Sequence, residues 1–194
     1  MNFKSQIQEY LKHEVEVIGR LDVDAINSAM NLLLEAYNAE KTIFIFGNGG
    51  SSATASHFAG DFNKGVSENL EKKFKFVCLN DNLPTLMAIA NDIGFEEIFR
   101  SQLKGYLKSG DIVIAISGSG NSANIINAVL YAKEKGNKVI GITGYGGGKL
   151  REMADIQLHA PVNSMQIAED VHMIFDHMMM SIFCKMMTGK DHFS

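Results

Sequence analysis

His57 and Asp61 are two side chains whose types and spacing suit chemistry. They are four residues apart in a stretch that predicts a helix, so both lie on one helical face and can reach one point in space. Such a pair can act in acid–base chemistry or supply two ligands to a metal ion. Surface helices also carry pairs of this kind as weak ion pairs, and the surrounding residues have to decide between these interpretations.

A turn suited to anions precedes this pair. The apolar run at residues 42–46 predicts a buried strand, and it ends in GNGGSS at residues 47–52. We expect Ser51 or Ser52 to cap the following helix, which would direct backbone N–H groups and the positive end of the helix dipole toward a ligand. The segment matches neither the NTP P-loop nor the dinucleotide fingerprint, so we expect no nucleotide cofactor.

A second loop of similar composition follows the clearest strand of the chain. The apolar run at residues 112–116 leads into SGSGNS at residues 117–122 and then into an apolar helical pattern. Strands that alternate with helices predict a parallel, doubly wound sheet, which binds ligands at the carboxyl ends of its strands. If the two strands are neighbours, both loops line one pocket, and their hydroxyl and amide groups suit a phosphate monoester of a polyol. Either loop by itself could instead be a connector.

The predicted closing helix at residues 165–187 carries further candidates for acid–base chemistry or metal binding. Glu169 and His172 are three residues apart, and His172 and Asp176 are four apart, so several polar side chains compete for one role. His177 follows Glu169 by eight residues, which allows the two to share a ligand. The alternative for a histidine beside three methionines is a place in the core or in a subunit interface.

The composition restricts the class of protein. The chain has 194 residues, 46% of them hydrophobic, which is enough for one domain with a large core. A net charge of −4 without a long basic run argues against nucleic acid as a partner. No apolar run reaches the roughly 18 residues that cross a bilayer, and the first residues are too polar for a signal peptide. With two isolated cysteines, Cys78 and Cys184, we expect a cytoplasmic protein with buried thiols and no membrane partner.

The expected organisation is a single domain over residues 1–194, with a helical segment at 1–40 before an α/β core at 41–194. Periodic apolar residues predict two helices within 3–37, which we expect to be a packing or oligomerisation element laid against the core. A further amphipathic helix is predicted at 95–107. The predicted strands lie at residues 42–46, 74–79, 112–116, 139–143 and 156–160.

Four segments of the sequence resemble the sugar isomerase (SIS) domain family, and within it the phosphoheptose isomerases. They are GNGGSSATASHFA at 47–59, AIANDIGFEEIF at 88–99, ISGSGNS at 116–122 and TGYGGGKL at 143–150. With the spacing of the closing helix, the resemblance covers nearly the whole chain. It implies a flavodoxin-like, five-stranded sheet and a homotetramer with its sites at subunit interfaces. It also implies conversion of sedoheptulose 7-phosphate to D-glycero-D-manno-heptose 7-phosphate for surface polysaccharide synthesis.

The resemblance implies roles for individual residues as well. The metal site would be His57, Asp61, Glu169 and His177, which predicts zinc or another divalent metal. Asp61, Glu169 and His177 are the implied catalytic residues. The implied substrate contacts are Asn48, Gly49, Gly50 and Ser51 in the first loop, Asn91 and Asp92 further along, and Ser117, Gly118, Ser119 and Ser122 in the phosphate loop.

Two of these positions depart from the family pattern. Asp61 stands where a glutamate usually acts as the base, and Glu169 stands where a glutamine is usual. The aspartate is one C–C bond shorter, so its carboxylate is withdrawn by roughly 1.5 Å. The glutamate adds a negative charge that a divalent cation would stabilise. The sequence leaves open whether Asp61 or Glu169 is the base and which phosphosugar reacts.

We therefore expect an aldose–ketose isomerase that moves a proton between C1 and C2 of a phosphorylated sugar through an enediol. The alternative is a non-catalytic SIS module that binds a phosphosugar or another protein. Such modules keep the serine loops and lack the acid–base residues. The four residues of the implied metal site therefore favour the enzyme.

Overall fold

Five apolar segments form the parallel sheet that the sequence predicts. The computed structural model describes residues 1–190, and its strands lie in the order β2-β1-β3-β4-β5. β1 and β3 are neighbours and are buried throughout, which explains their continuous apolar sequences. The strand order reverses between them, at the place where sheets of this kind bind ligands. The strands are β1 (Ile43–Gly47), β2 (Phe76–Cys78), β3 (Ile112–Ser117), β4 (Lys138–Thr143) and β5 (Ile156–His159).

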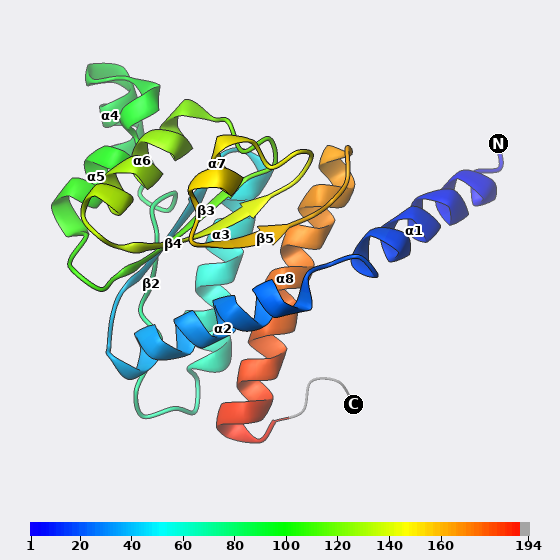
Figure 1. The fold of residues 1–194 in the computed structure, drawn as a ribbon, viewed down its shortest axis with the longest axis horizontal. Coiled ribbons are helices and arrows are strands. Elements are labelled where there is room, and N and C mark those ends of the chain that lie inside the picture. Colours follow the sequence, from blue (N-terminus) through cyan, green and yellow to red (C-terminus); the bar gives the residue numbers. More distant parts are fainter. Residues whose placement is uncertain (191–194) are drawn as a thin grey trace.

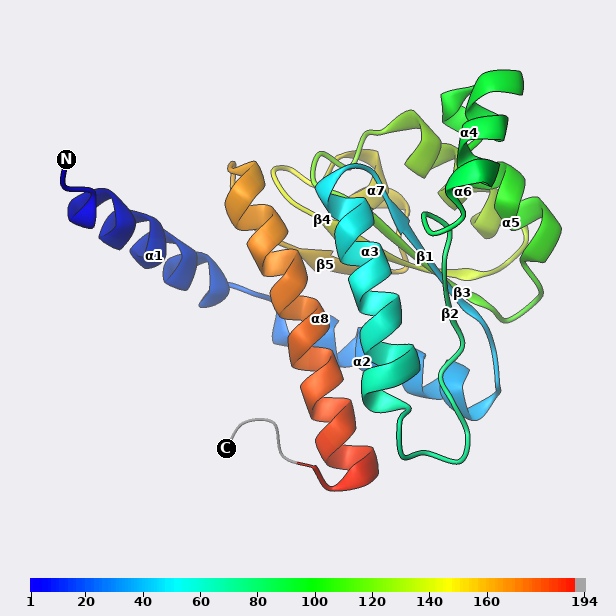
Figure 2. The ribbon, with the colours of Figure 1, turned by 180° about the vertical axis from the view of Figure 1, so that it is seen from behind.

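Helices cover both faces of the sheet (Figure 1) and bury one hydrophobic cluster on each side. One face packs against α2 (Val23–Asn38), α3 (Gly50–Gly60) and α8 (Met165–Thr188). The other face packs against α5 (Arg100–Tyr106), α6 (Ala123–Glu134) and α7 (Gly148–Met153). Figure 2 shows α3 and α8 side by side, both starting at the carboxyl edge of the sheet. This pair of helices positions the candidate site.

The first helix, α1 (Lys4–Ile18), does not lie against the core. It projects from the body of the molecule (Figure 1), and Val17 is its only buried residue. The Tyr10 hydroxyl donates a hydrogen bond to the Asp170 carboxylate of α8 and connects the projecting helix to the body. The expectation that both N-terminal helices pack on the core is therefore wrong for α1 and correct for α2, whose buried residues join the cluster on that face.

The predicted amphipathic helix at residues 95–107 is interrupted. A 3₁₀ turn, Phe95–Glu97, follows α4 (Leu83–Asp92), and the α-helix begins only at Arg100. The tighter winding of the 3₁₀ turn rotates Phe95 away from the core, and its side chain is 59% exposed. Ile98, Phe99 and Leu103 are buried as the apolar pattern predicts.

Two predictions about the environment of the chain can be compared with the described residues. Cys78 and Cys184 are free and buried, which confirms the prediction of isolated core thiols. Within residues 1–190, no helix combines the length and the apolar character that a bilayer crossing requires.

Candidate active site

The loops after β1 and β3 meet at the carboxyl edge of the sheet. Asn48 Nδ2 donates to Asn124 Oδ1, and Asn124 Nδ2 donates to Asn48 Oδ1, both at 2.9 Å. Asn124 lies in the first turn of α6 and is buried. Its role could not be predicted, because an amide within an apolar helical pattern does not reveal its partner. The paired amides hold the two loops at a fixed separation.

A pocket of about 140 Å³ lies between these loops and the first turns of α8. Most of its lining comes from residues that the sequence assigned to substrate binding, together with Glu169. The lining residues are Asn48, Ser51, Ile116, Ser117, Gly118, Ser119, Ser122, Met165 and Glu169.

The loop after β3 offers hydroxyl groups with unused hydrogen-bonding capacity. Ser122 is the N-cap residue of α6, yet its side chain makes no capping bond. The Ser119 hydroxyl accepts a hydrogen bond from the Asn121 N–H at 3.3 Å, and the Ser117 hydroxyl accepts one from the Gly120 N–H at 3.1 Å. Each hydroxyl therefore keeps its own proton available for donation. Donors of this kind at the start of a helix suit an oxyanion.

The turn after β1 differs from the predicted one. Gly49 is the N-cap of α3, and Ser51 and Ser52 lie within the helix, so the prediction of a serine cap is wrong. Gly49 has φ +54°, a backbone conformation that favours glycine over serine. At Gly50 a Cβ atom would lie 2.7 Å from the carboxyl carbon of Glu169. The carboxylate of Glu169 thus lies against the N-terminus of α3, where the helix dipole favours negative charge.

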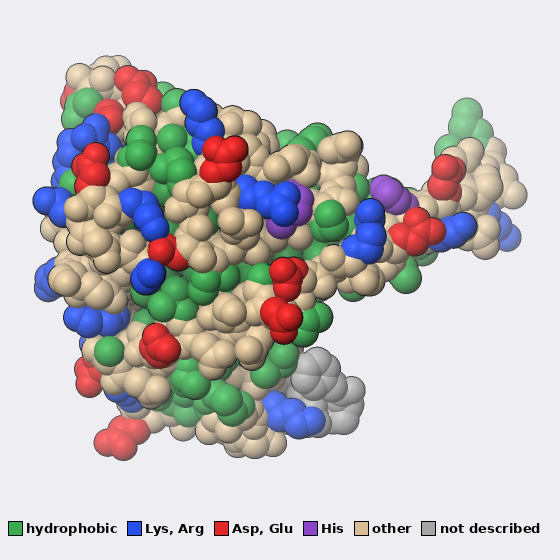
Figure 3. All heavy atoms as spheres, in the orientation of Figure 1, with side chains coloured by type: hydrophobic (Ala, Val, Ile, Leu, Met, Phe, Trp, Pro, Cys, Tyr) green, Lys and Arg blue, Asp and Glu red, His purple; other side chains and the backbone are tan. Residues whose placement is uncertain are grey.

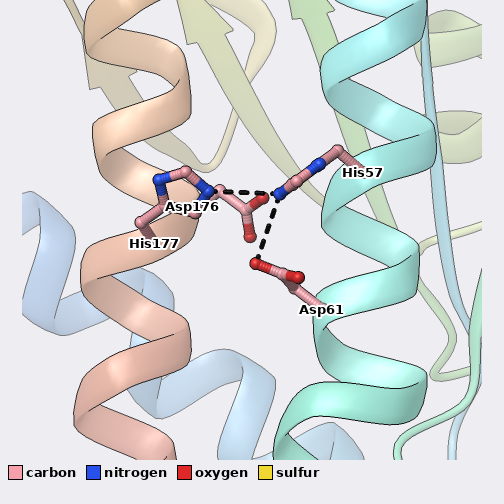
Figure 4. A group of neighbouring side chains, drawn as sticks. All are labelled: His57, Asp61, Asp176 and His177. Carbon is pink, nitrogen blue, oxygen red and sulfur yellow. Dashed lines mark hydrogen bonds and ion pairs between the residues drawn. The ribbon is translucent and has the colours of Figure 1, made fainter. Parts of the chain in front are cut away.

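Further along the same helices, four side chains form a group (Figure 4). His57 and Asp61 come from α3 and the π-helical turn that continues it, Asp61–Val66, and they face Asp176 and His177 on α8. One ligand atom from each side chain lies within 4.8 Å of the other three. His57 Nε2 is 3.1 Å from His177 Nε2 and 3.5 Å from Asp61 Oδ2. The fold therefore brings together residues separated by 120 positions in the sequence.

Two distances in this group are close to those between the ligands of a tetrahedral divalent metal. Ligand atoms at 2.0–2.1 Å from zinc are about 3.3 Å apart when the ion is tetrahedral. The separations of 3.1 Å and 3.5 Å lie on either side of this value. Imidazole nitrogens and carboxylate oxygens are both ligands that zinc accepts, and two carboxylates balance its charge. The donor set and its geometry thus fit the metal that the resemblance implies.

Asp176 is the member of this group that does not belong to the metal site implied by the family resemblance. Its side chain is fully buried, and neither carboxylate oxygen has a hydrogen-bond partner within the described residues. Burial, and then the charge of Asp61, raise the pKa of Asp176 to about 8. Consecutive residues of a helix usually point in different directions, so helical spacing does not predict that Asp176 and His177 face the same group. A buried carboxylate without a partner is unfavourable unless a cation compensates it.

Three of the predicted site residues lie elsewhere. Glu169 is not part of the group formed by His57, Asp61, Asp176 and His177, since it faces the pocket between the loops. Asn91 and Asp92 are exposed at the end of α4, where Asn91 Nδ2 donates to Asp92 Oδ1 at 2.7 Å. Neither lines the pocket of its own chain.

The chain is similar to a known domain family and to proteins named phosphoheptose isomerase. A family model described as "SIS domain" matches residues 4–144. The phosphoheptose isomerase of Aliarcobacter butzleri is 34% identical over 173 residues, which cover 88% of this chain and 91% of the relative. The phosphoheptose isomerase of Leptospira biflexa is 34% identical over 189 residues, covering 97% and 96% of the two chains.

A solved structure agrees with this relationship. The phosphoheptose isomerase GmhA of Neisseria gonorrhoeae has a TM-score of 0.86 and 29% identity, with 94% of this chain and 98% of that chain covered. The match extends over the sheet, the two loops and the closing helix, since it covers nearly all of both chains. By sequence and by fold, the chain belongs to the SIS domain family.

Proposed function

We propose that this protein is an aldose–ketose isomerase that interconverts sedoheptulose 7-phosphate and D-glycero-D-manno-heptose 7-phosphate. The relatives named phosphoheptose isomerase support this class of substrate. One observation carries the proposal: an anion pocket and a His/Asp group lie along the same two helices, α3 and α8. A phosphorylated sugar can therefore bind by its phosphate while its carbonyl end reaches toward groups that transfer protons.

The phosphate is assigned to the loop after β3. Ser117, Ser119 and Ser122 donate hydrogen bonds to its oxygens, supported by the N-terminus of α6. The N-terminus of α3 already faces the carboxylate of Glu169, which would repel a second anion. Asn48 supports the phosphate loop through its bonds to Asn124.

Isomerisation requires a base close to the carbon beside the carbonyl group. The base takes the proton, the C–H electron pair forms the C=C bond of an enediolate, and the carbonyl π electrons move to oxygen. Return of the proton to the neighbouring carbon, with a proton moved between the two oxygens, gives the isomer. Asp61 and Glu169 are the candidate bases, and His177, whose side chain is exposed, can transfer the proton between oxygens.

The proposed cofactor is zinc or another divalent metal, held by His57, Asp61 and His177, with no nucleotide cofactor. When bound, such an ion supplies positive charge that polarises a carbonyl oxygen. His57, Asp61 and His177 hold the ligand positions, and the buried carboxylate of Asp176 lies beside them.

The proposal is tested by incubating the zinc-loaded protein with sedoheptulose 7-phosphate in D₂O and following C1 and C2 by NMR. We expect exchange of hydrogen for deuterium and appearance of the aldose phosphate. The dephosphorylated sugar is the matched control and should react far more slowly, because the phosphate loop has nothing to bind. Binding without exchange would contradict the enzyme and favour the alternative, a non-catalytic phosphosugar-binding module.

The proposed assembly is a homotetramer with sites at subunit interfaces. An apolar groove of about 610 Å³ lies between α2 and the second half of α8 and shares no lining residue with the pocket between the loops. Hydrophobic side chains gather over this region in Figure 3, and α1 extends beside it as an arm. The arm exposes Ile7, Leu11 and Val15, so helix and groove offer matching apolar surfaces between subunits.

We further propose that the protein acts in the cytoplasm and supplies heptose for surface polysaccharides. The two free, buried thiols support a reducing compartment. Sugar phosphates are the expected small-molecule partners, without nucleic acid or membrane, since the net charge is −4.

A further inference from the structure

We propose that the chain carries a second anion-binding site, separate from the phosphate loop, which takes the phosphate group of a small phosphorylated molecule. The site is a polar pocket of about 400 Å³ along β5, the last strand of the sheet, between the start of α2 and α7. We call it the β5 pocket, and its basic lining residues are Arg20, Arg151 and His159. It shares no lining residue with the pocket between the loops after β1 and β3. The proposal concerns binding alone and does not rest on the isomerase function.

The first argument is the state of the arginines. The chain has three, and one of them, Arg100, forms an ion pair with Glu97 at 3.1 Å. The other two, Arg20 and Arg151, both line the β5 pocket. Neither forms an ion pair with a carboxylate of residues 1–190. In a protein with a net charge of −4, two unpaired arginines at one pocket indicate a site for a negative charge.

Most of the donors of these two guanidinium groups are available to a ligand. Arg20 donates from Nε to the carbonyl of Glu16 at 3.3 Å and from Nη2 to the carbonyl of Pro161 at 3.2 Å. Arg151 donates from Nε to Gln157 Oε1 at 3.3 Å. These bonds are made to neutral oxygens and orient the two side chains without cancelling their charge. An arginine has five N–H donors, so each guanidinium can still bind an oxyanion through two of them.

The carboxylates that also line the β5 pocket are already compensated. Asp155 lies 2.8 Å from Lys133 Nζ and 3.2 Å from Lys138 Nζ. Asp22 caps α2, where its Oδ1 accepts a hydrogen bond from the Ala25 N–H at 3.0 Å and the helix dipole favours its charge. The charge that remains without a partner in the pocket is therefore positive.

His159 is the third basic group of the β5 pocket. It is half-buried, and its Nδ1 lies 3.0 Å from Thr143 Oγ1, which leaves Nε2 without a hydrogen-bond partner in the described part of the chain. Burial, and then the charge of Arg151, lower the pKa of His159. The positive charge of Arg151 thus acts inside the pocket, where it would stabilise a bound anion. Figure 3 shows basic and histidine side chains together over β5.

The size and the donors of the β5 pocket indicate the class of ligand. Two guanidinium groups are suited to the oxygens of a phosphate, which they bind through paired, charge-assisted hydrogen bonds. The volume of about 400 Å³ exceeds that of a phosphate ion and falls in the range of pockets for small molecules. The rest of the ligand should be polar, because polar side chains dominate the lining. Sugar phosphates and nucleotides share this chemistry.

NMR spectra of the histidine rings test the proposal on the whole protein at fixed pH. Inorganic phosphate is the first probe, and the His159 resonance is identified by its absence in His159→Gln. We expect a saturable shift of this resonance with phosphate and no shift with sodium chloride at equal ionic strength. Ser119→Ala/Ser122→Ala, which weakens the phosphate loop, should keep the shift. ADP and glucose 6-phosphate are then titrated in the same way, and the one that binds more tightly distinguishes a nucleotide from a sugar phosphate.

Variants of the arginines provide the matched comparison. Arg20→Gln/Arg151→Gln should weaken phosphate binding at His159 by at least about tenfold, because both charged donors are lost. Arg100→Gln removes the same group from an arginine outside the pocket and should keep the affinity of the parent protein. All these side chains are on or near the surface, and unchanged circular dichroism should show that the variants fold.

Three results would overturn the proposal. They are the absence of a saturable shift in the parent protein, equal affinity in Arg20→Gln/Arg151→Gln, and loss of the shift in Ser119→Ala/Ser122→Ala, which would place the anion in the phosphate loop. Because the measurement follows a histidine resonance and no turnover, it is independent of the proposed function. A protein that binds phosphate beside His159 and isomerises no sugar phosphate would refute the isomerase and leave this site in place.

Discussion

The side chains of Asn48 and Asn124 bond to each other twice and tie the loop after β1 to the first turn of α6. Asn124→Ala should leave the Asn48 amide unpaired and allow the loops to separate. We expect a loss of about 1–3 kcal/mol in the free energy of unfolding and a several-fold rise in KM for the sugar phosphate. Urea denaturation and steady-state kinetics measure the two effects. Asn127→Ala on the same helix is the control and should change KM little.

Ser122 provides a test of the phosphate loop that does not disturb the fold. Its hydroxyl makes no capping bond, so Ser122→Ala should leave the melting temperature unchanged. KM for a phosphorylated substrate should rise much more than kcat falls, because the lost bond holds the phosphate in both ground state and transition state. Ser119→Ala should act in the same direction. An unchanged KM in both variants would place the phosphate elsewhere, and Ser28→Ala on α2 is the matched control.

His172 is a buried titratable side chain outside the group formed by His57, Asp61, Asp176 and His177. Because it is buried, we expect the free energy of unfolding to depend on pH. Burial lowers the pKa of His172 from 6.5 to about 4, and its side chain is fully buried. A depressed pKa in the folded state means that the unfolded chain binds the proton first, so stability is present above pH 6.5 and is lost as pH falls toward 4.

Between pH 7 and pH 5, His172 should remove about 2 kcal/mol from the free energy of unfolding. His172→Leu should show a loss smaller by that amount over the same interval. His13→Leu on the exposed α1 should keep the pH dependence of the parent protein. Urea titrations at the two pH values provide the measurement, and equal slopes for His172→Leu and the parent protein would contradict the prediction.

The projecting helix α1 predicts concentration-dependent assembly. Leu11 is 54% exposed on the apolar side of α1, so Leu11→Glu should disrupt an interface between subunits without touching the core. Sedimentation velocity should show a smaller species than the parent protein, and the unchanged far-UV circular dichroism should show that the fold remains. Lys12→Glu introduces the same side chain on the adjacent, charged position of α1 and should leave the assembly intact. An unaltered sedimentation coefficient for Leu11→Glu would exclude α1 from the interface.

Much of the fold follows from local patterns in the sequence. Continuous apolar runs predicted β1 and β3, and the polar loops after them predicted that both strands end at one ligand-binding edge. The relation of His57 to Asp61 followed from helical spacing, which depends only on nearby residues. Asn124, Asp176 and the direction of α1 could not be predicted in this way, because their positions depend on contacts between distant elements. The start of the amphipathic helix predicted at 95–107 was wrong because a 3₁₀ turn and an α-helix share an apolar pattern over so few residues.

The His/Asp group joins two segments that are far apart in the sequence: α3 with the π-helical turn that continues it, and α8. α3 follows the first strand, α8 follows the last, and all five strands lie outside the group. An ion bound between α3 and α8 would therefore stabilise the contact between these two helices, and it would not be needed for the sheet to form. The sheet would form before the ion binds, and removal of the ion would loosen α8 while the strands stay paired. In a cell short of metal, the metal-free protein would then remain folded but inactive. It would recover its metal site when the ion binds again.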